Sequence, residues 1–435
     1  MKNNRNHRTL VLILLTLLYA FNFIDRQIVG ILAPFFAEEL GLNNTQIGLL
    51  TGLAFAFLYT IVGIPIAFLA DRVNRVNILA ISLATWSGFT ALMGFTNSFT
   101  QMAIARMGVG IGEAGGSPPA HSIISDMYPK EKRASALAIY SLGIPFGIMF
   151  AYFTVAMFLG KSDDQVPWRQ IFIALGLAGI VLAITLRLVL REPERGAQEK
   201  KRGVAIKTPP FFEALKTLLT IPSWWAMCMG IASASFVGYS FNAFQTKYLI
   251  PFDPEFDKRM LMVVLGIING IFYAAGIYLG ARLTDKMGKK SVRAYGWVPA
   301  ISVAIACPMA VASFWAPSVW GHLSFVTIFV FFLGVYLGPS FAIAQTLAPI
   351  NMRAMSTAMY FFILNMIAMG LGPLFTGLLA DMFAKSHDPV HAVRLALSIT
   401  CMGLLVSAGF FLLAAKLLPR DWKRAEERNE GIAPE

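Results

Sequence analysis

Arg106 and Glu113 are two opposite charges inside one apolar stretch, RMGVGIGEAGGSPP at residues 106–119. The stretch also contains a literal G-x-G-x-x-G starting at Gly110, a pattern that can open a dinucleotide-binding loop. Such a loop needs a strand before it and a helix after it, within a βαβ unit of about 30 residues. No strand-like segment precedes these glycines, which lie inside one continuous apolar segment. The sequence therefore argues against a nucleotide site.

The glycines are better explained by helix packing. In a membrane helix, glycine lets the backbone of a neighbouring helix come close. Gly108, Gly112 and Gly116 recur at intervals of four residues, which suits such a packing face. Pro118 and Pro119 lack an amide hydrogen, so we expect them to bend or loosen the helix after the glycines.

Helix packing does not account for the charges. Seven residues separate Arg106 from Glu113, which places both within about 20° of one helical face. Asp25 and Arg26 lie together in the first apolar segment. A rise of about 1.5 Å per residue puts all four charges in one layer about 10 Å deep. We expect this four-charge cluster to pair Asp25 with Arg106 and Arg26 with Glu113.

Two interpretations of the four-charge cluster are open, an ion-pair clamp between helices and a transport pathway. Ionisable residues cost roughly 2.5–3.5 kcal/mol each within a membrane and usually mark ion pathways or proton relays, which favours transport. Arginine stays charged, so a carboxylate has to titrate. We predict Glu113 as the first proton site and Asp25 as the second, with Arg26 and Arg106 as their partners or as ligands of an anionic head group. His121 could assist, although a histidine satisfied near a helix end explains it better.

The composition predicts an all-α membrane protein. Of 435 residues, 57% are hydrophobic and 14% are charged, against about a quarter charged in soluble domains. Apolar runs of about 20 residues recur along the chain, and the first reads as a retained span rather than a cleaved signal peptide. We predict twelve spans, at 9–37, 45–70, 77–96, 100–126, 134–159, 168–190, 223–247, 260–282, 293–314, 320–348, 354–380 and 391–418.

The spans fall into two similar halves. Residues 1–190 form a predicted six-helix bundle, 191–222 a cytoplasmic linker with an interfacial helix at 211–219, and 223–435 a second bundle. LADRVNR at 69–75 matches LTDKMGK at 283–289, each expected in the loop after the second span of its half. A P-x-x-x-R-A-x-x-x-A-x-Y pattern occurs at Pro129 and again at Pro349. Most Lys and Arg lie in loops on one side, which predicts that both termini are cytoplasmic.

These residues resemble a known family. The L-x-D-[RK]-x-x-[RK] loops resemble the signature loop of the major facilitator superfamily. NFIDRQIVGIL at 22–32, the glycine-rich stretch at 106–119 and SLGIPFG at 141–147 resemble the Spinster family of lipid transporters. The resemblance implies twelve helices in two pseudo-symmetric bundles, the same roles for the four-charge cluster, and substrate sites between the halves.

The superfamily resemblance also implies a cytoplasmic gate. Its predicted members lie in or near the two matching loops, and the alternative is ordinary positive-inside loop charge. They are Asp71, Arg72, Arg75, Arg133, Asp285 and Lys286.

The second half has aromatic and amide side chains where the first has charges. A cavity charged on one wall and aromatic on the other suits an amphiphile with a polar head and an apolar tail. For any single aromatic residue, contact with lipid or a neighbouring helix is the simpler explanation. The predicted cavity residues are Tyr239, Asn242, Gln245, Tyr336 and Gln345.

Together these observations predict a proton-coupled transporter that works by alternating access. Its expected substrate is an amphiphilic lipid such as a lysophospholipid or a sphingoid lipid. A multidrug or organic-anion carrier is the alternative, and a membrane-embedded enzyme is a distant one, because the spans hold no H-x-x-x-H or G-x-S-x-G motif.

We expect a monomer in a cell membrane, most simply a bacterial inner membrane, in contact with membrane lipids and without cofactor, metal or nucleic acid. Cys228, Cys307 and Cys401 lie in apolar runs and are expected to fill the core.

Overall fold

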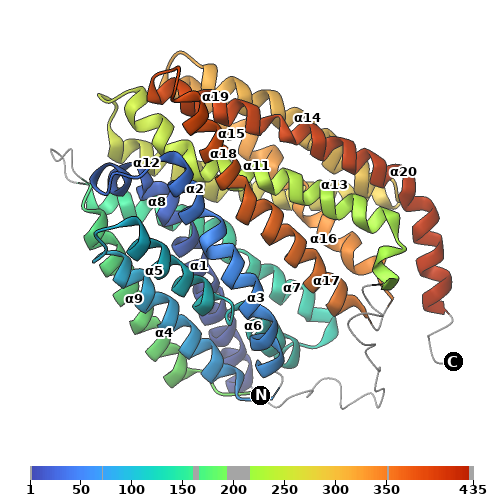
Figure 1. Cartoon of the computed structure of the whole chain (residues 1–435). Helices are drawn as coiled ribbons and strands as arrows, with labels where there is room; N and C mark the ends of the chain where they lie inside the picture. Colours follow the sequence, from blue (N-terminus) through green and yellow to red (C-terminus); the bar gives the residue numbers. More distant parts are fainter. Residues whose placement is uncertain (1, 71, 160–165, 194–215, 350–351, 431–435) are drawn as a thin grey trace. The chain divides into compact units, whose positions relative to one another are not determined.

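The computed structural model describes residues 2–70, 72–159, 166–193, 216–349 and 352–430. The described chain consists of helices joined by short connections, and no strand occurs within it (Figure 1). Residues 194–215 of the predicted linker lie outside the described residues. Of the predicted interfacial helix, only residues 216–219 are described, and they are helical.

The first unit comprises Met1–Val204 together with Asn242–Gly270. Its helices hold the four-charge cluster and include the beginning of the second half of the chain. They are α1 (Lys2–Glu39), α2 (Asn44–Thr51), α3 (Leu53–Ala70), α4 (Arg75–Met93), α5 (Phe99–Glu113), α6 (Ser117–Met127), α7 (Lys130–Ser141), α8 (Gly143–Phe158), α9 (Trp168–Val189) and α12 (Lys258–Ile267).

The second unit comprises Ala205–Phe241 together with Ile271–Glu435. Helix α11 (Pro222–Phe252) contributes to both units, and the boundaries at 190 and 223 remain a prediction. The other helices of this unit are α13 (Tyr273–Gly288), α14 (Ala294–Trp315), α15 (Val319–Val335), α16 (Leu337–Thr346), α17 (Arg353–Leu364), α18 (Gly372–Phe383), α19 (Pro389–Cys401) and α20 (Gly403–Glu430). π-Helical turns at Ile268–Phe272 and Asn365–Leu371 join α12 to α13 and α17 to α18.

All twelve predicted spans are helical, and ten helices of the described chain are long and apolar enough to cross a membrane. The other two predicted spans are 100–126 and 223–247. The first is broken after Glu113 into α5 and α6, of 15 and 11 residues. The second is α11, a continuous helix of 31 residues that carries several hydroxyl and amide side chains.

In the first unit, α4 packs against α9 and α5, α1 packs against α8, and α3 packs against α5. One end of this bundle is fastened by Glu39, at the last residue of α1. Its carboxylate accepts hydrogen bonds from Trp168 Nε1 at 2.7 Å and from Arg169 Nη2 at 2.8 Å, both on α9. Arg169 Nη1 also donates to the carbonyl of Thr96, just after α4, at 2.6 Å. These contacts tie α1, α4 and α9 together at the end of α1.

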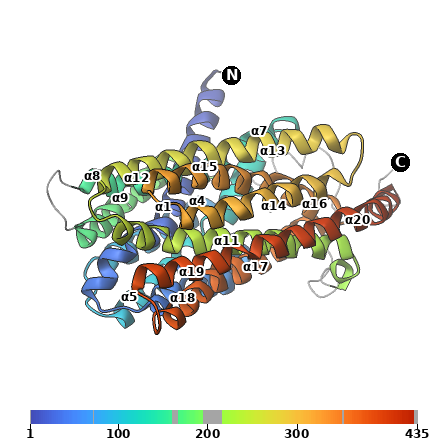
Figure 2. The ribbon, with the colours of Figure 1, turned by 90° about the horizontal axis from the view of Figure 1, so that it is seen from above.

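The second unit has a neutral polar interior. The hydroxyls of Ser235 and Tyr336 lie 2.9 Å apart, and Trp224 Nε1 donates to Ser356 Oγ at 2.7 Å. Helix α20 runs alongside α14 (Figures 1 and 2). Its buried Asp421 accepts hydrogen bonds from the amide and hydroxyl of Ser223, and so caps the start of α11. These buried side chains satisfy one another by hydrogen bonds.

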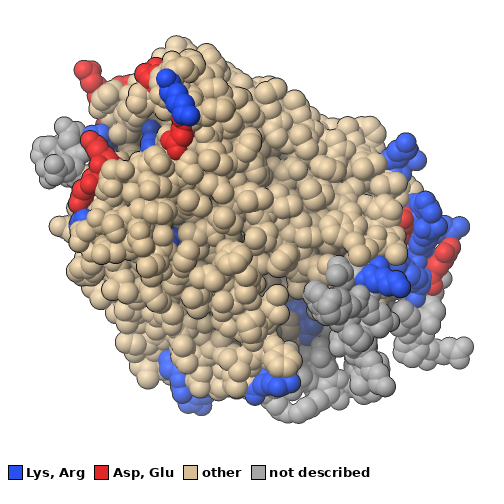
Figure 3. Space-filling model, viewed as in Figure 1, with Lys and Arg blue, Asp and Glu red and all other residues tan. Residues whose placement is uncertain are grey.

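The surface matches a chain that crosses a membrane. In the face seen in Figure 3, charged side chains gather towards helix ends, and uncharged side chains cover most of the helices between them. Large apolar side chains are exposed on many helices, among them Ile64, Ile81 and Leu188. Such a surface would be unfavourable in water but suits lipid contact.

Of the two sequence repeats, the proline-arginine pattern ends alike in both copies, whereas the signature loop does not have the same structure in both. Tyr140 and Tyr360, the last residues of the two proline-arginine patterns, are both fully buried. The predicted second signature loop is wrong, since residues 283–288 form the last turns of α13. No helix-breaking residue occurs before Gly288, so the helix continues through the motif.

Candidate functional site

Four charged side chains lie buried in the first unit. Asp25 and Arg26 come from the middle of α1, and Arg106 and Glu113 come from α5. The relative exposure is 4% for Asp25, 1% for Arg106 and 0% for Glu113, and that of the Arg26 side chain is 8%. Their enclosure in an otherwise apolar bundle makes this cluster the candidate site.

Arg26 and Glu113 form an ion pair, as predicted. Arg26 Nε lies 2.8 Å from Glu113 Oε2. The guanidinium also lies 5.2 Å from the ring centroid of Phe23, 5.3 Å from that of Phe55 and 4.7 Å from that of Tyr59. Arginine stacks well on aromatic rings, so these three rings can hold the cation in place whether or not the carboxylate is charged.

The predicted pair between Arg106 and the Asp25 carboxylate is wrong. Arg106 Nη1 donates instead to the main-chain carbonyl of Asp25 at 3.1 Å, and its Nε donates to the carbonyl of Leu50 at 3.3 Å. Leu50 lies in the last turn of α2, where carbonyls lack partners within the helix, and α2 ends at a break at Gly52. The guanidinium also lies 4.4 Å from the Phe55 ring centroid. Arg106 therefore binds carbonyl oxygens and an aromatic ring.

The Asp25 carboxylate points to a partner that the sequence did not reveal. Its Oδ1 accepts a hydrogen bond of 2.9 Å from the hydroxyl of Thr90 on α4, and both groups are buried. A threonine in an apolar span carries no pattern that marks such a role. The only available signal was that α4 holds several hydroxyl residues, Ser82, Ser87 and Thr90 among them.

The glycines of α5 bring its backbone close to α3 and α4. A Cβ on Gly110 would lie 2.7 Å from the carbonyl oxygen of Phe55, and a Cβ on Gly112 would lie 2.5 Å from the amide nitrogen of Trp86. These positions admit only glycine without a shift of the neighbouring helix. The structure thus supports the packing explanation for this stretch.

The proline pair has the predicted effect. Helix α5 ends at Glu113, and the chain turns through residues 114–116, with Gly116 N donating to the carbonyl of Glu113 at 3.0 Å. Pro118 and Pro119 then occupy the first turn of α6, where a missing amide hydrogen is tolerated. Glu113 consequently stands at a helix end, next to a break within the span.

We expect Gly112→Ala to lower the free energy of unfolding by about 1–3 kcal/mol, because the added methyl group would overlap the backbone of Trp86. Gly88→Ala is the matched control, since a Cβ there meets no atom within 4 Å. Thermal unfolding in detergent measures both. Equal melting temperatures for the two variants would contradict the packing explanation.

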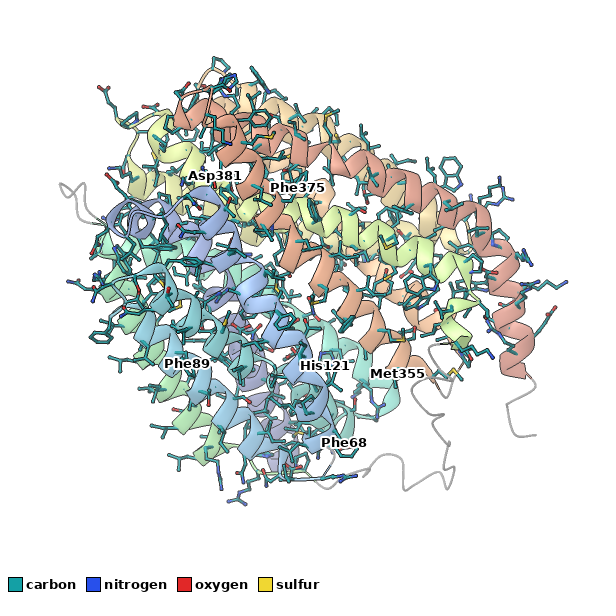
Figure 4. All side chains as sticks on the ribbon, viewed as in Figure 1. Phe68, Phe89, His121, Met355, Phe375 and Asp381 are labelled. Carbon is teal, nitrogen blue, oxygen red and sulfur yellow. The ribbon has the colours of Figure 1, made fainter. Side chains whose placement is uncertain are left out.

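His121 on α6 lies apart from any ion pair of the described cluster. Figure 4 labels His121. Its ring packs edge-on against the buried Tyr140, with centroids 5.2 Å apart. Much of its side chain is exposed within the described structure. This placement agrees with the simpler explanation, a histidine held by packing.

One residue of the predicted cytoplasmic gate, Arg75, lies at the centre of a buried polar cluster. Arg75, at the start of α4, is 2% exposed, and its guanidinium contacts Asp126 on α6 and Glu192 just after α9. It also donates to Ser122 Oγ at 2.7 Å and to the carbonyl of Pro193 at 3.1 Å. Sequence reasoning missed both acids, of which Asp126 ends the fourth predicted span and Glu192 follows the sixth.

The other predicted gate residues do not join Arg75 in the described structure. Arg72 is exposed and lies 3.9 Å from the Phe68 ring centroid, and Arg133 donates to the carbonyl of Ser125 at 2.7 Å. Asp285 accepts a bond of 3.3 Å from Tyr295, and Lys286 is exposed. Asp71 lies outside the described residues.

The predicted cavity residues are divided between the two units. Tyr336, bonded to Ser235, half-buried Tyr239 and exposed Gln345 belong to the second unit. Half-buried Asn242 and buried Gln245 belong to the first. Their part of α11 passes close to α1, since a Cβ on Gly30 would lie 3.0 Å from the Asn242 carbonyl. The role of all five in substrate binding stays a prediction.

No group of three or more potential metal ligands occurs within the described residues. All three cysteines are buried and free, in keeping with core positions. The chemistry of the site is that of buried charges, hydroxyls and aromatic rings.

Comparison with known proteins places this geometry in a family. The model of the major facilitator superfamily matches residues 15–373. The chain is 27% identical to an MFS-type efflux pump of Mycolicibacterium smegmatis, over 94% of this chain and 92% of the pump. It is 24% identical to protein spinster homolog 1 of Xenopus tropicalis, over 98% of this chain and 84% of that protein.

The fold agrees with these matches. A crystal structure of a bacterial homolog of the human lysosomal transporter Spinster, in an inward-facing and unoccupied conformation, superimposes with a TM-score of 0.85 and 29% identity. The match covers 95% of this chain and 98% of that one. The chain therefore belongs to the major facilitator superfamily, as a Spinster-like membrane transporter.

Proposed function

We propose that this transporter couples the movement of its substrate to protons, and that Glu113 carries the proton. The observation behind this proposal is the buried ion pair between Arg26 and Glu113. A fully enclosed pair is costly in a membrane, and ionisable groups persist there chiefly along ion or substrate pathways.

Protonation of Glu113 would remove the negative partner of Arg26, because the guanidinium itself keeps its charge. The rings of Phe23, Phe55 and Tyr59 would still hold the cation, as they do now. Arg26 would then be available to an anionic group, for which a guanidinium is a strong bidentate donor. Proton and anionic substrate would thus be linked through one side chain, with Asp25 as a second proton site.

An amphiphilic lipid with an anionic head group, such as a lysophospholipid, is the substrate that this arrangement favours. The first unit offers buried cations, whereas the described interior of the second offers hydroxyl and aromatic groups such as Tyr336 and Ser235. The similarity to spinster homologs supports a lipid.

A multidrug or organic-anion carrier is the second candidate. It is favoured by the 27% identity to a bacterial efflux pump across almost the whole chain. Such a carrier would use the same charges with a soluble substrate.

For the membrane setting, we propose a monomer in a bacterial inner membrane with both termini on the cytoplasmic side. The excess of Lys and Arg in loops on one side supports this orientation.

The test is proton uptake in proteoliposomes that contain a pH-sensitive dye, on addition of lysophosphatidylcholine or lysophosphatidylglycerol. We expect lipid-dependent uptake with the wild-type protein and none with Glu113→Gln, which keeps the shape but cannot titrate. Glu38→Gln is the matched control, because Glu38 is exposed at the end of α1. Protein-free liposomes report the leak that lysolipids cause.

Each outcome has a definite meaning. Equal uptake in wild type and Glu113→Gln would remove Glu113 as the proton site. Uptake driven by soluble organic anions but not by lipids would favour the second candidate. No proton movement with any substrate would overturn proton coupling.

A further inference from the structure

The Asp25 carboxylate and the Arg26–Glu113 pair are neighbouring polar groups that are bonded to different helices. Asp25 Oδ1 is bound by Thr90 on α4, whereas the ion pair joins α1 to α5. The charged groups that face Asp25 are Glu113 and Arg106 from α5, with Arg26 beside it on α1. Helix α4 faces this carboxylate with two neutral groups, the Thr90 hydroxyl, which bonds to it at 2.9 Å, and the indole of Trp86.

Thr90 is held rigidly. It is 1% exposed, and α4 packs closely against α9 on one side and α5 on the other. Trp86 lies one turn before Thr90 on the same face, is fully buried, and is the residue against which Gly112 packs. The hydroxyl that reaches Asp25 is therefore fixed relative to the helix segment that carries Glu113.

A hydroxyl suits a carboxyl group that changes its protonation state. It can donate a hydrogen bond to the ionised carboxylate, and it can accept one from the protonated acid. Bonds to charged groups are the stronger ones, so the hydroxyl favours the ionised form. Its removal should make Asp25 take up a proton at higher pH.

We propose that Thr90 is a positioning residue for the proton chemistry of Asp25 and sets the pH range over which the transporter works. This inference rests on the proposed proton coupling. It adds α4, which carries no member of the four-charge cluster, to the elements that control that coupling.

Thr90→Val is the test variant, because valine has nearly the shape of threonine but no hydroxyl. We expect the midpoint of the pH profile of lipid-driven proton uptake to move upward by about one pH unit, the size expected for one hydrogen bond to a charged group. Thr90→Ser restores the hydroxyl and should keep the wild-type midpoint. Thr60→Val is the matched control, since the buried Thr60 hydroxyl bonds, among the described residues, to the carbonyl of Ala56 in its own helix.

A second measurement does not depend on transport. A hydrophobic carbodiimide reacts with protonated carboxyl groups, and mass spectrometry of the Asp25 peptide gives the pH at which half of it is labelled. We expect the same upward shift in Thr90→Val and no shift in Thr90→Ser. Should Thr90→Val not fold, Thr90→Ala is measured in the same way.

An unchanged labelling midpoint in a folded variant without the hydroxyl would overturn the inference. Loss of uptake in both Thr90→Val and Thr90→Ser, with unchanged labelling, would show a purely structural residue and would overturn it as well. A labelling shift in a protein without lipid-driven uptake would support the role of Thr90 and refute the proposed function, so the two failures are distinguishable.

Discussion

Arg26→Met is expected to reduce proton-coupled transport to background and to lower the free energy of unfolding by about 3–5 kcal/mol. The substitution keeps an apolar side chain among Phe23, Phe55 and Tyr59 but leaves the fully buried Glu113 without its ion-pair partner. Removing one partner of a buried pair is costly because the remaining charge is not compensated. Thermal unfolding in detergent and the dye assay in proteoliposomes measure the two effects.

The double variant Arg26→Met with Glu113→Gln separates stability from function. Without either charge, the site should regain most of the lost stability, because a buried pair replaced on both sides is often close to neutral. Transport should stay at background, since no titrating group remains in the pair. Transport by the double variant would show that the pair is only a clamp between α1 and α5.

Arg75→Ala is expected to lower the free energy of unfolding by a similar amount, about 3–5 kcal/mol, at another charged centre of the first unit. Its guanidinium binds Asp126, Glu192, Ser122 and the carbonyl of Pro193. Because the amide nitrogen of Arg75 also donates to Glu192 at 2.8 Å, loss of the side chain would loosen the start of α4. The melting temperature in detergent is the readout.

The neighbouring Arg72 provides the control for this prediction. Its side chain is exposed and stacks on Phe68, so Arg72→Ala should leave the melting temperature close to that of the wild type. Arg75→Lys should fall between the two, because lysine keeps the charge but not the planar fork that binds two carboxylates. A melting temperature for Arg75→Ala equal to that of Arg72→Ala would refute the structural role of Arg75.

The helices could be predicted because apolar length is a strong signal, but their interruptions could not. Pro118 and Pro119 predicted the break after Glu113. No proline marks the break at Gly52, and Pro373, just after the π-helical turn at Asn365–Leu371, indicates an interruption there but not its π-helical form. These breaks depend on how neighbouring helices pack, which a single sequence does not record.

The site was predictable as far as charge alone could guide it. Charged residues are rare in spans, which singled out Asp25, Arg26, Arg106 and Glu113. The Arg26–Glu113 pair was expected because all four charges lie in one layer across the helices. Asp25 is bound by a hydroxyl, and Arg106 is bound by carbonyl groups. Such groups are common in helices, so the sequence does not mark them as partners. The partner Glu192 lies 117 residues from Arg75, and only the folded bundle brings them together.

The ring of Phe55 touches both arginines of the cluster. Its centroid lies 5.3 Å from the guanidinium carbon of Arg26 and 4.4 Å from that of Arg106. The electron-rich face of an aromatic ring attracts a cation, so two cations at one ring draw on the same attraction. Thermodynamic linkage is reciprocal, and whatever moves one guanidinium away from the ring changes how firmly the ring holds the other. A displacement of the Arg26 guanidinium would thus change the binding of the Arg106 guanidinium through one aromatic ring on α3.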